Sequence, residues 1–290
     1  MMEITALSAL EQAMLERPGV PADVVMEALA EGLGLLGEVE PPVDMRLLAS
    51  LQSIGQITQK LSAHAGCLIN QDGRLRLELN PLDRPERQNF TIGHEVCHTL
   101  LPGFTLTTNF RCNPGGSRPR ATEKLNVEWL ADVGASELLL PRRFVQDEFD
   151  DAEFSWEAIE RVAVEYGASL EATARRRVRL SDRSAVFVNL QFGTSRTNPV
   201  PELRVRSASW SHLPDVFIPR NKSIPRTHSI FRATDGEYID EVAHLHALTR
   251  RRGAYEVTAR PYPYINSEAE TVMRVLVLAR KVLPRSVPLR

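Results

Sequence analysis

The chain has 290 residues, of which 43% are hydrophobic and 25% are charged. This composition is typical of a globular protein with one large or two modest domains and excludes the disordered and fibrous classes. The 35 basic and 37 acidic side chains nearly balance, although residues 201–290 carry 15 basic against 9 acidic ones, and this excess is far below that of a strongly basic nucleic-acid-binding protein.

The three cysteines, Cys67, Cys97 and Cys112, are an odd and sparse set. Such a set argues against a disulfide framework and favours a reducing compartment. No apolar run approaches the roughly 18 residues of a membrane span, and the N-terminus lacks the basic and then apolar segments of a signal peptide. We therefore expect a cytoplasmic protein without a membrane partner.

The front of the chain is predicted to be helical. Residues 3–36 indicate two helices, separated by a break at Pro18–Pro21. In Arg46–Leu61 the apolar residues recur at helical spacing, which predicts a third helix.

The pattern then changes to that of a β-hairpin. Cys67–Asn80 contains an Asp-Gly turn at Asp72, followed by strict alternation of Leu75, Leu77 and Leu79. This predicts two strands with one buried face. The outer edge of the second strand either pairs with an extended substrate segment by β-strand addition or is a sheet edge that binds no other segment.

The next predicted helix begins near Asn89–Thr91 and ends at Pro102-Gly103. Phe104–Thr122 is a long loop rich in Thr, Asn, Gly, Pro and Arg, which either borders a cleft or is simply mobile. A further helix is predicted from about Glu123 to Leu140, where Pro141 ends it.

The back of the chain mixes helices and strands. A helix pair is predicted first, with Gly167 after the first helix and Ser169 as the N-cap of the second. In chain order the predicted elements are helices Phe154–Gly167 and Ser169–Leu180, strands Ala185–Phe192 and Leu203–Ala208, a helix around Tyr238–Leu248, and strands Tyr255–Tyr262 and Val272–Lys281.

The chemistry of the sequence lies in a His-Glu-x-x-His motif at residues 94–98. Residues four apart on a helix are offset by about 40°, so His94 and His98 project from one face and are able to bind one divalent ion. Zn²⁺ is the ion that suits two imidazoles best. Glu95 reaches the attacking water rather than the metal, which makes it the expected general base.

A catalytic zinc needs a third protein ligand, and the following helix supplies acids for it. Glu128 is the predicted ligand, and Asp132, four residues on, is the predicted acceptor for the outer N–H of a ligand histidine. Three other acids are rival third ligands: Glu123, Glu137 and Asp72. The first lies at a helix start, where the macrodipole already favours an acid, and the second lies on a different turn from Glu128.

These blocks resemble the signature of the ImmA/IrrE family of metallopeptidases. In that family a Pro-Glu-Arg-Gln-x-Phe-Thr run precedes the H-E-x-G-H helix, as residues 85–98 do here. A second family block resembles Glu128–Asp132, followed by the Leu-Leu-Pro stop that ends at Pro141. Cys97 departs from the family, which usually has Gly there. It is either a small core residue or a further ligand or redox-sensitive group.

The resemblance implies a regulatory endopeptidase that cleaves a helix-turn-helix repressor of the XRE type, with His94, His98 and Glu128 as ligands of one Zn²⁺ and Glu95 as catalytic base. It implies an α+β fold in three parts. These are a zincin-like domain at 1–150 with N-terminal helices, a helix-turn-helix-like element at 151–182, and an α+β, GAF-like domain at 183–290.

Two other functions stay open on the sequence. One is a DNA-binding transcriptional regulator with a structural or vestigial metal site, because Arg175–Arg179 follows the helix-turn-helix-like pair. The N-terminal end of that second helix has no basic or amide side chain, so we expect a packed helix with a solvated basic face and no direct nucleic-acid binding. The other is a small-molecule sensor in which the C-terminal domain gates the protease.

Overall fold

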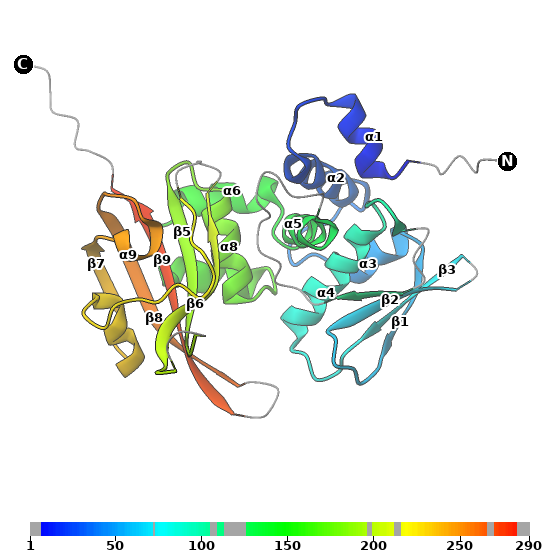
Figure 1. Ribbon diagram of the computed structural model, residues 1–290. Helices are drawn as coiled ribbons and strands as arrows, with labels where there is room; N and C mark the ends of the chain where they lie inside the picture. The colour runs from blue at the N-terminus through cyan, green and yellow to red at the C-terminus, as the bar shows by residue number, and fades with distance from the viewer. Residues whose placement is uncertain are drawn as a thin grey trace, which may run out of the picture. The chain divides into compact units, whose positions relative to one another are not determined.

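A computed structural model describes residues 7–71, 73–104, 109–112, 126–195, 199–211, 216–265 and 270–282. Within these residues the backbone forms two β-sheets, each with its own helices (Figure 1). The chain divides into two compact units. The first comprises Met1–Asp151 and Glu160–Thr173, and the second comprises Ala152–Ile159 and Ala174–Arg290. The fold class is therefore α+β, as predicted.

The first unit opens with the two predicted helices, α1 (Ala9–Glu16) and α2 (Ala22–Leu36). Ser8 caps α1 by accepting a hydrogen bond from the backbone N–H of Glu11, whose carboxylate accepts one from the backbone N–H of Ser8 in return. Such a cap is a strong local signal because the first turn of a helix leaves N–H groups without intrahelical partners.

The predicted third helix is wrong over its second half. Helix α3 (Met45–Leu51) ends early, Ser53 adopts a left-handed φ of 61°, and β1 (Ile54–Gln59) follows as a strand. The apolar spacing did not reveal this change because β1 is fixed by parallel pairing with a strand some twenty residues later in the chain.

The β-hairpin prediction is confirmed by β2 (Gly66–Gln71) and β3 (Arg74–Leu79), which pair antiparallel. The alternating leucines of β3 are all buried. With β4 (Asn109–Cys112) the sheet order is β1-β3-β2-β4. The suggested substrate pairing along the outer edge of β3 is therefore wrong, because β1 and β2 already occupy both of its edges.

Helices α4 (Pro85–His98) and α5 (Val127–Leu139) pack against each other in the first unit. Helix α4 begins four residues before the predicted start, with Pro85 in its first turn, where the missing N–H of proline costs nothing. Their close approach depends on Gly134, where an added Cβ would lie 2.6 Å from both the Cys97 sulfur and the Met26 methyl group.

Three helices follow, α6 (Arg142–Asp151), α7 (Trp156–Glu165) and α8 (Leu170–Arg179). The last two confirm the predicted helix pair, whereas α6 was not predicted. Gly167 after α7 has the left-handed φ of 59° expected of a C-terminal glycine, and the Ser169 hydroxyl accepts a hydrogen bond from the backbone N–H of Ala172.

The predicted solvated basic face on α8 is wrong, because the arginine run turns inward. Arg176 is fully buried and Arg177 is 7% exposed. Within the second unit, Arg175 donates to the hydroxyls of Ser207 and Ser209. A guanidinium carries five N–H donors, so an arginine can lie inside the protein where neighbouring segments supply acceptors such as these hydroxyls.

The second unit is built on a five-stranded antiparallel sheet of order β6-β5-β9-β8-β7. Its elements are β5 (Ala185–Gly193), β6 (Glu202–Trp210), the 3-10 helix η2 (Ser229–Asp235), β7 (Ile239–Ala243), the short α9 (His246–Thr249), β8 (Tyr255–Ile265) and β9 (Thr271–Lys281). The four predicted strands are confirmed. The helix predicted around Tyr238–Leu248 is wrong, since β7 occupies its first half by pairing with β8.

The domain boundaries at 150 and 182 stay predictions. Among the described residues, no helix is both long enough and apolar enough to cross a membrane.

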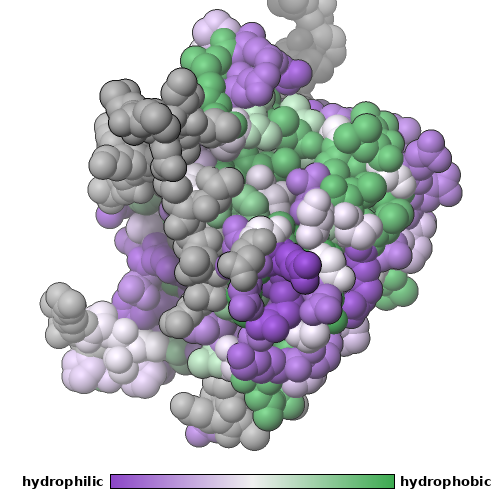
Figure 2. Space-filling view, turned by 90° about the vertical axis from the view of Figure 1, so that its right-hand side faces the viewer, coloured by the Kyte–Doolittle hydropathy of each residue, from purple (hydrophilic) through white to green (hydrophobic). Residues whose placement is uncertain are grey.

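On the face seen in Figure 2, hydrophobic areas lie between hydrophilic ones. Scattered apolar side chains are ordinary at protein surfaces, so we assign these areas no function.

Candidate metal centre

The metal centre lies where α4 meets the first turn of α5. His94 and His98 are 0% and 2% exposed on α4, and Glu128 lies two residues after the N-cap of α5. The Nε2 atoms of the two histidines are 3.0 Å apart. Each also lies 3.4 Å from one carboxylate oxygen of Glu128. The structure thus brings together the three residues that the sequence assigned as ligands.

The hydrogen bonds around His94 orient its ring for binding a cation. Its Nδ1 lies 2.9 Å from Oδ1 of Asp132, and a carboxylate only accepts, so Nδ1 carries the proton of the neutral ring. Nε2 is then the unprotonated nitrogen, and it points at His98 and Glu128. Asp132 has the position predicted for the acceptor behind a ligand histidine.

The spacing of these atoms fits a zinc ion. Two ligands about 2.0–2.1 Å from a tetrahedral zinc lie roughly 3.3 Å apart, close to the observed 3.0 and 3.4 Å. One ligand atom from each of the three residues lies within 4.8 Å of the others. Two imidazole nitrogens and one carboxylate are also the donor types that catalytic zinc takes. These three side chains are therefore able to hold a metal.

Glu95 is buried beside this group without a hydrogen-bond partner of its own. Neither carboxylate oxygen accepts a hydrogen bond from a described residue. Burial raises the pKa of Glu95 to about 8, the charge on His94 opposes the rise, and the charge on Glu128 adds to it. A buried carboxylate left without donors is costly, and a nearby cation would remove that cost, which again fits a metal site.

The titration of the other groups is consistent with ligand behaviour. The imidazoles of His94 and His98, whose Nε2 atoms face its two oxygens, hold the pKa of Glu128 well below its usual range, so this carboxylate is ionised at neutral pH. Burial lowers the pKa of His98 despite its hydrogen bond to Glu128, which favours the neutral ring that binds metals.

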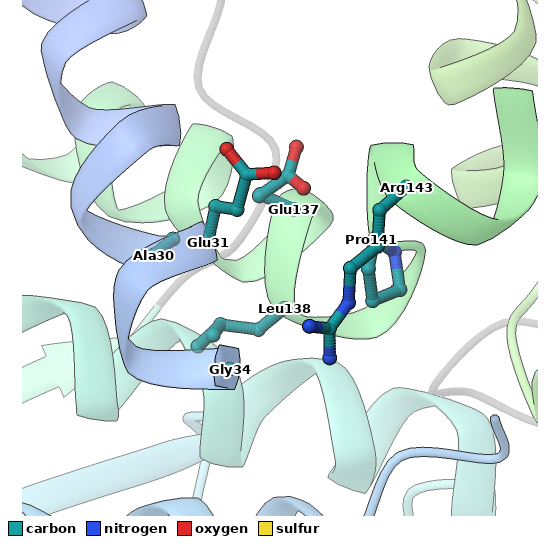
Figure 3. Close-up of a pocket in the computed structure, with 7 residues that line it drawn as sticks. All are labelled: Ala30, Glu31, Gly34, Glu137, Leu138, Pro141 and Arg143. Atoms are coloured by element: carbon teal, nitrogen blue, oxygen red, sulfur yellow. The ribbon is translucent and has the colours of Figure 1, made fainter. Parts of the chain in front are cut away.

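Of the rival third ligands, the structure bears on Glu137 alone, and it does not support that residue. Glu137 lies on α5, beside a gap of only about 10 Å³ that residues of α2 also line (Figure 3). Its carboxylate accepts a hydrogen bond of 2.9 Å from the backbone N–H of Arg142. The Glu137 carboxylate therefore serves as acceptor for a free backbone N–H group at the start of α6 rather than as a metal ligand. Glu123 and Asp72 lie outside the described residues, as does most of the predicted Phe104–Thr122 loop.

Cys97 is a core residue in this structure. It is fully buried, and its sulfur faces the surface of α5 at Gly134. Burial raises the pKa of the thiol to about 12, so the thiolate needed for metal binding or ready oxidation is not formed at neutral pH. The reading of Cys97 as a small packing residue is the one that this geometry favours.

Sequence reasoning missed Asn126, which fixes the start of α5. Its side-chain oxygen accepts a hydrogen bond of 3.1 Å from the backbone N–H of Trp129. This bond caps the helix at the turn that carries Glu128. The available signal was an asparagine directly before an apolar helical run, but the helix was predicted to begin at Glu123, three residues earlier.

Comparison with known proteins shows what the part of the chain that contains this site is similar to. The model of the peptidase M78 family, described as the IrrE N-terminal-like domain, matches residues 57–177. The radiation response metalloprotease IrrE of Deinococcus deserti (strain DSM 17065 / CIP 109153 / LMG 22923 / VCD115) is 37% identical over 70 residues, which cover 24% of this chain. The aligned part also spans only 24% of that protein's length.

A solved structure extends the likeness of fold beyond the matched domain. The structure of a Mycobacterium tuberculosis transcriptional regulator superposes with a TM-score of 0.57, covers 95% of this chain and 82% of its own, and is 14% identical. That identity supports a shared fold alone. The family match, in contrast, spans α4, α5 and the side chains that converge between them. Residues 57–177, which contain the three converging side chains, thus match the IrrE N-terminal-like domain of the peptidase M78 family.

Proposed function

We propose that the protein is a zinc-dependent endopeptidase in which His94, His98 and Glu128 hold the ion and Glu95 is the catalytic base. One observation carries this proposal. Three ligand atoms of suitable type lie within 4.8 Å of one another, and a buried carboxylate without hydrogen-bond partners lies on the next residue of the same helix. A purely structural zinc site would close its fourth position with another protein ligand, and the described residues offer none.

The residues of the chain divide the work of peptide hydrolysis. When bound, zinc supplies Lewis-acid polarisation of the scissile carbonyl and of the attacking water. Glu95 takes a proton from that water and returns it to the leaving amine. Asp132 holds the His94 ring in place.

The substrate we propose is a transcriptional repressor of the XRE type, whose cleavage releases stress-response or mobile-element genes. The supports are the family domain and the similar radiation response metalloprotease IrrE. Within this proposal, residues 151–182 form a helix-turn-helix-like element, residues 183–290 are GAF-like, and the protein works in the cytoplasm.

The test is cleavage of a purified XRE-type repressor, with any repressor of this type encoded next to this chain's gene as the first substrate. The zinc-loaded wild-type chain should cut it into two fragments of defined mass. Glu95→Gln should keep its zinc and lose cleavage, because the amide cannot take a proton. Glu86→Gln, on the same helix α4, is the matched control and should cut normally. Cleavage by Glu95→Gln at the wild-type rate would remove Glu95 from the mechanism.

A DNA-binding regulator with a vestigial metal site is the alternative, and the structure weakens its basis. The arginines of α8 that suggested it are largely engaged within the protein. Electrophoretic mobility shift with the neighbouring promoter, with and without a chelator, separates the two functions. A shift without any peptidase activity would favour the regulator.

A further inference from the structure

A second candidate site lies in the second unit, among residues that take no part in the metal centre. It is a concave pocket of about 680 Å³, between the start of β6, residues 222–226, η2 and α9. This volume is within the usual range of small-molecule sites, roughly 300–1,000 Å³.

The pocket is built on ordered backbone. The segment that contains residues 222–226 runs beside the free edge of β6, where Ile224 N–H donates to the Leu203 carbonyl and Val205 N–H donates to the Lys222 carbonyl, both at 2.9 Å. Leu203 and Ile224 are 1% and 3% exposed and belong to the core of the unit. The pocket therefore has a fixed apolar base rather than a loose loop.

Two cations, Lys222 and Arg226, line this pocket. Glu202 is the acid of the lining, and it is already ion-paired with Arg204. Among the described residues, no carboxylate lies within 4.0 Å of the Lys222 ammonium or the Arg226 guanidinium. The lining thus offers uncompensated positive charge, which favours an anionic group.

An aromatic ring lies beside these cations. The guanidinium carbon of Arg226 is 5.8 Å from the centre of the Phe231 ring, which in turn contacts the Phe192 ring edge to face at a centroid distance of 5.9 Å. Phe231 is only partly buried and lines the pocket. A flat apolar group can stack on such a ring while an anion meets the guanidinium above it.

We propose that this pocket binds a small organic anion with a flat, apolar body. Lys222 and Arg226 would hold the anionic group, and Phe231, with the base formed by Leu203 and Ile224, would hold the body. The inference is independent of the peptidase function, because it uses none of the residues of the metal centre.

The experiment uses two dyes that differ by one charged group. Anilinonaphthalene sulfonate has a flat apolar body and a sulfonate, and N-phenyl-1-naphthylamine has the same body without it. Titration of the full chain, followed by fluorescence, should show saturable binding of the sulfonate dye with one site. Lys222→Ala and Arg226→Ala should each weaken that binding on the order of tenfold and leave binding of the neutral dye nearly unchanged. Phe231→Ala should weaken both.

Arg220→Ala is the matched control, because Arg220 is an exposed cation of the same unit that does not line the pocket. It should change neither dye, and circular dichroism of each variant checks that the fold is intact. Equal losses in Arg220→Ala would mean that general surface charge holds the dye, and would overturn the proposal. Absence of saturable binding, or binding unaffected by Lys222→Ala and Arg226→Ala, as expected if the dye sits on the hydrophobic areas of Figure 2, would overturn it as well.

Discussion

Asp132 Oδ1 lies 2.9 Å from Nδ1 of His94, on the side of the ring away from His98 and Glu128. This contact joins α5 to α4 a second time, one helical turn after Glu128. It fixes which nitrogen of His94 is unprotonated, and therefore which nitrogen is available to a metal. The two helices are thus held in register by the same side chains that create the site.

Removing that acceptor should weaken metal binding without removing a ligand. In Asp132→Ala the His94 ring loses its orientation, and zinc affinity should fall about 10–100-fold. Competition with a chromophoric zinc chelator measures the change. Asp147→Ala, an exposed acid of α6 in the same unit, should bind zinc like the wild type. Unchanged affinity in Asp132→Ala would show that His94 is oriented by something else.

The cap of α5 should also matter for the metal. Asn126→Ala removes the acceptor for the Trp129 N–H and should lower the free energy of unfolding by about 1 kcal/mol. Because the frayed turn carries Glu128, zinc affinity should fall as well. Asn126→Asp keeps a capping oxygen and should restore both quantities. If zinc affinity stays normal in Asn126→Ala while stability falls, the cap supports the helix but does not position the ligand.

The close contact between α4 and α5 should not tolerate a methyl group at residue 134. In Gly134→Ala the new Cβ would lie 2.6 Å from the Cys97 sulfur and the Met26 methyl group, and overpacking of this kind costs about 1–3 kcal/mol. Urea unfolding of the metal-free protein measures it. Gly32→Ala is the control, because its Cβ would meet nothing within 4 Å in helix α2, and it should stabilise the helix by up to about 1 kcal/mol.

The buried Glu95 should make the metal-free protein less stable as pH rises. Its pKa is about 8 in the folded chain against 4.5 for an unperturbed glutamate, so the folded state holds the proton more tightly than the unfolded state. The contribution of Glu95 to stability is complete below pH 4.5 and is lost as pH rises through about 8.

Comparison with Glu95→Gln isolates this effect. Between pH 5 and pH 8.5, values chosen to bracket most of the transition, the unfolding free energy of the metal-free wild type should fall by roughly a few kcal/mol more than that of the variant. Urea unfolding at both pH values gives the two differences. Parallel pH dependences in the two proteins would mean that Glu95 is already ionised in the folded, metal-free site.

Local sequence patterns were enough to predict several parts of the molecule. The spacing of His94 and His98 follows from the pitch of one helix, and the alternation of leucines in β3 follows from the two-residue period of a strand. The choice of Glu128 also came from the sequence, since an acid carried among apolar helix residues needs a partner. These features need only neighbouring residues to be recognised.

Features that depend on contacts between distant chain segments became apparent only in the folded chain. The tertiary structure turned Ile54–Gln59 and Ile239–Ala243 from predicted helix into strand, because pairing with β3 and β8 outweighs the helical spacing of a short segment. It buried the arginines of α8 and closed both edges of β3. It also created the pocket beside Lys222, because backbone pairing between two segments separated in sequence is invisible in either segment alone.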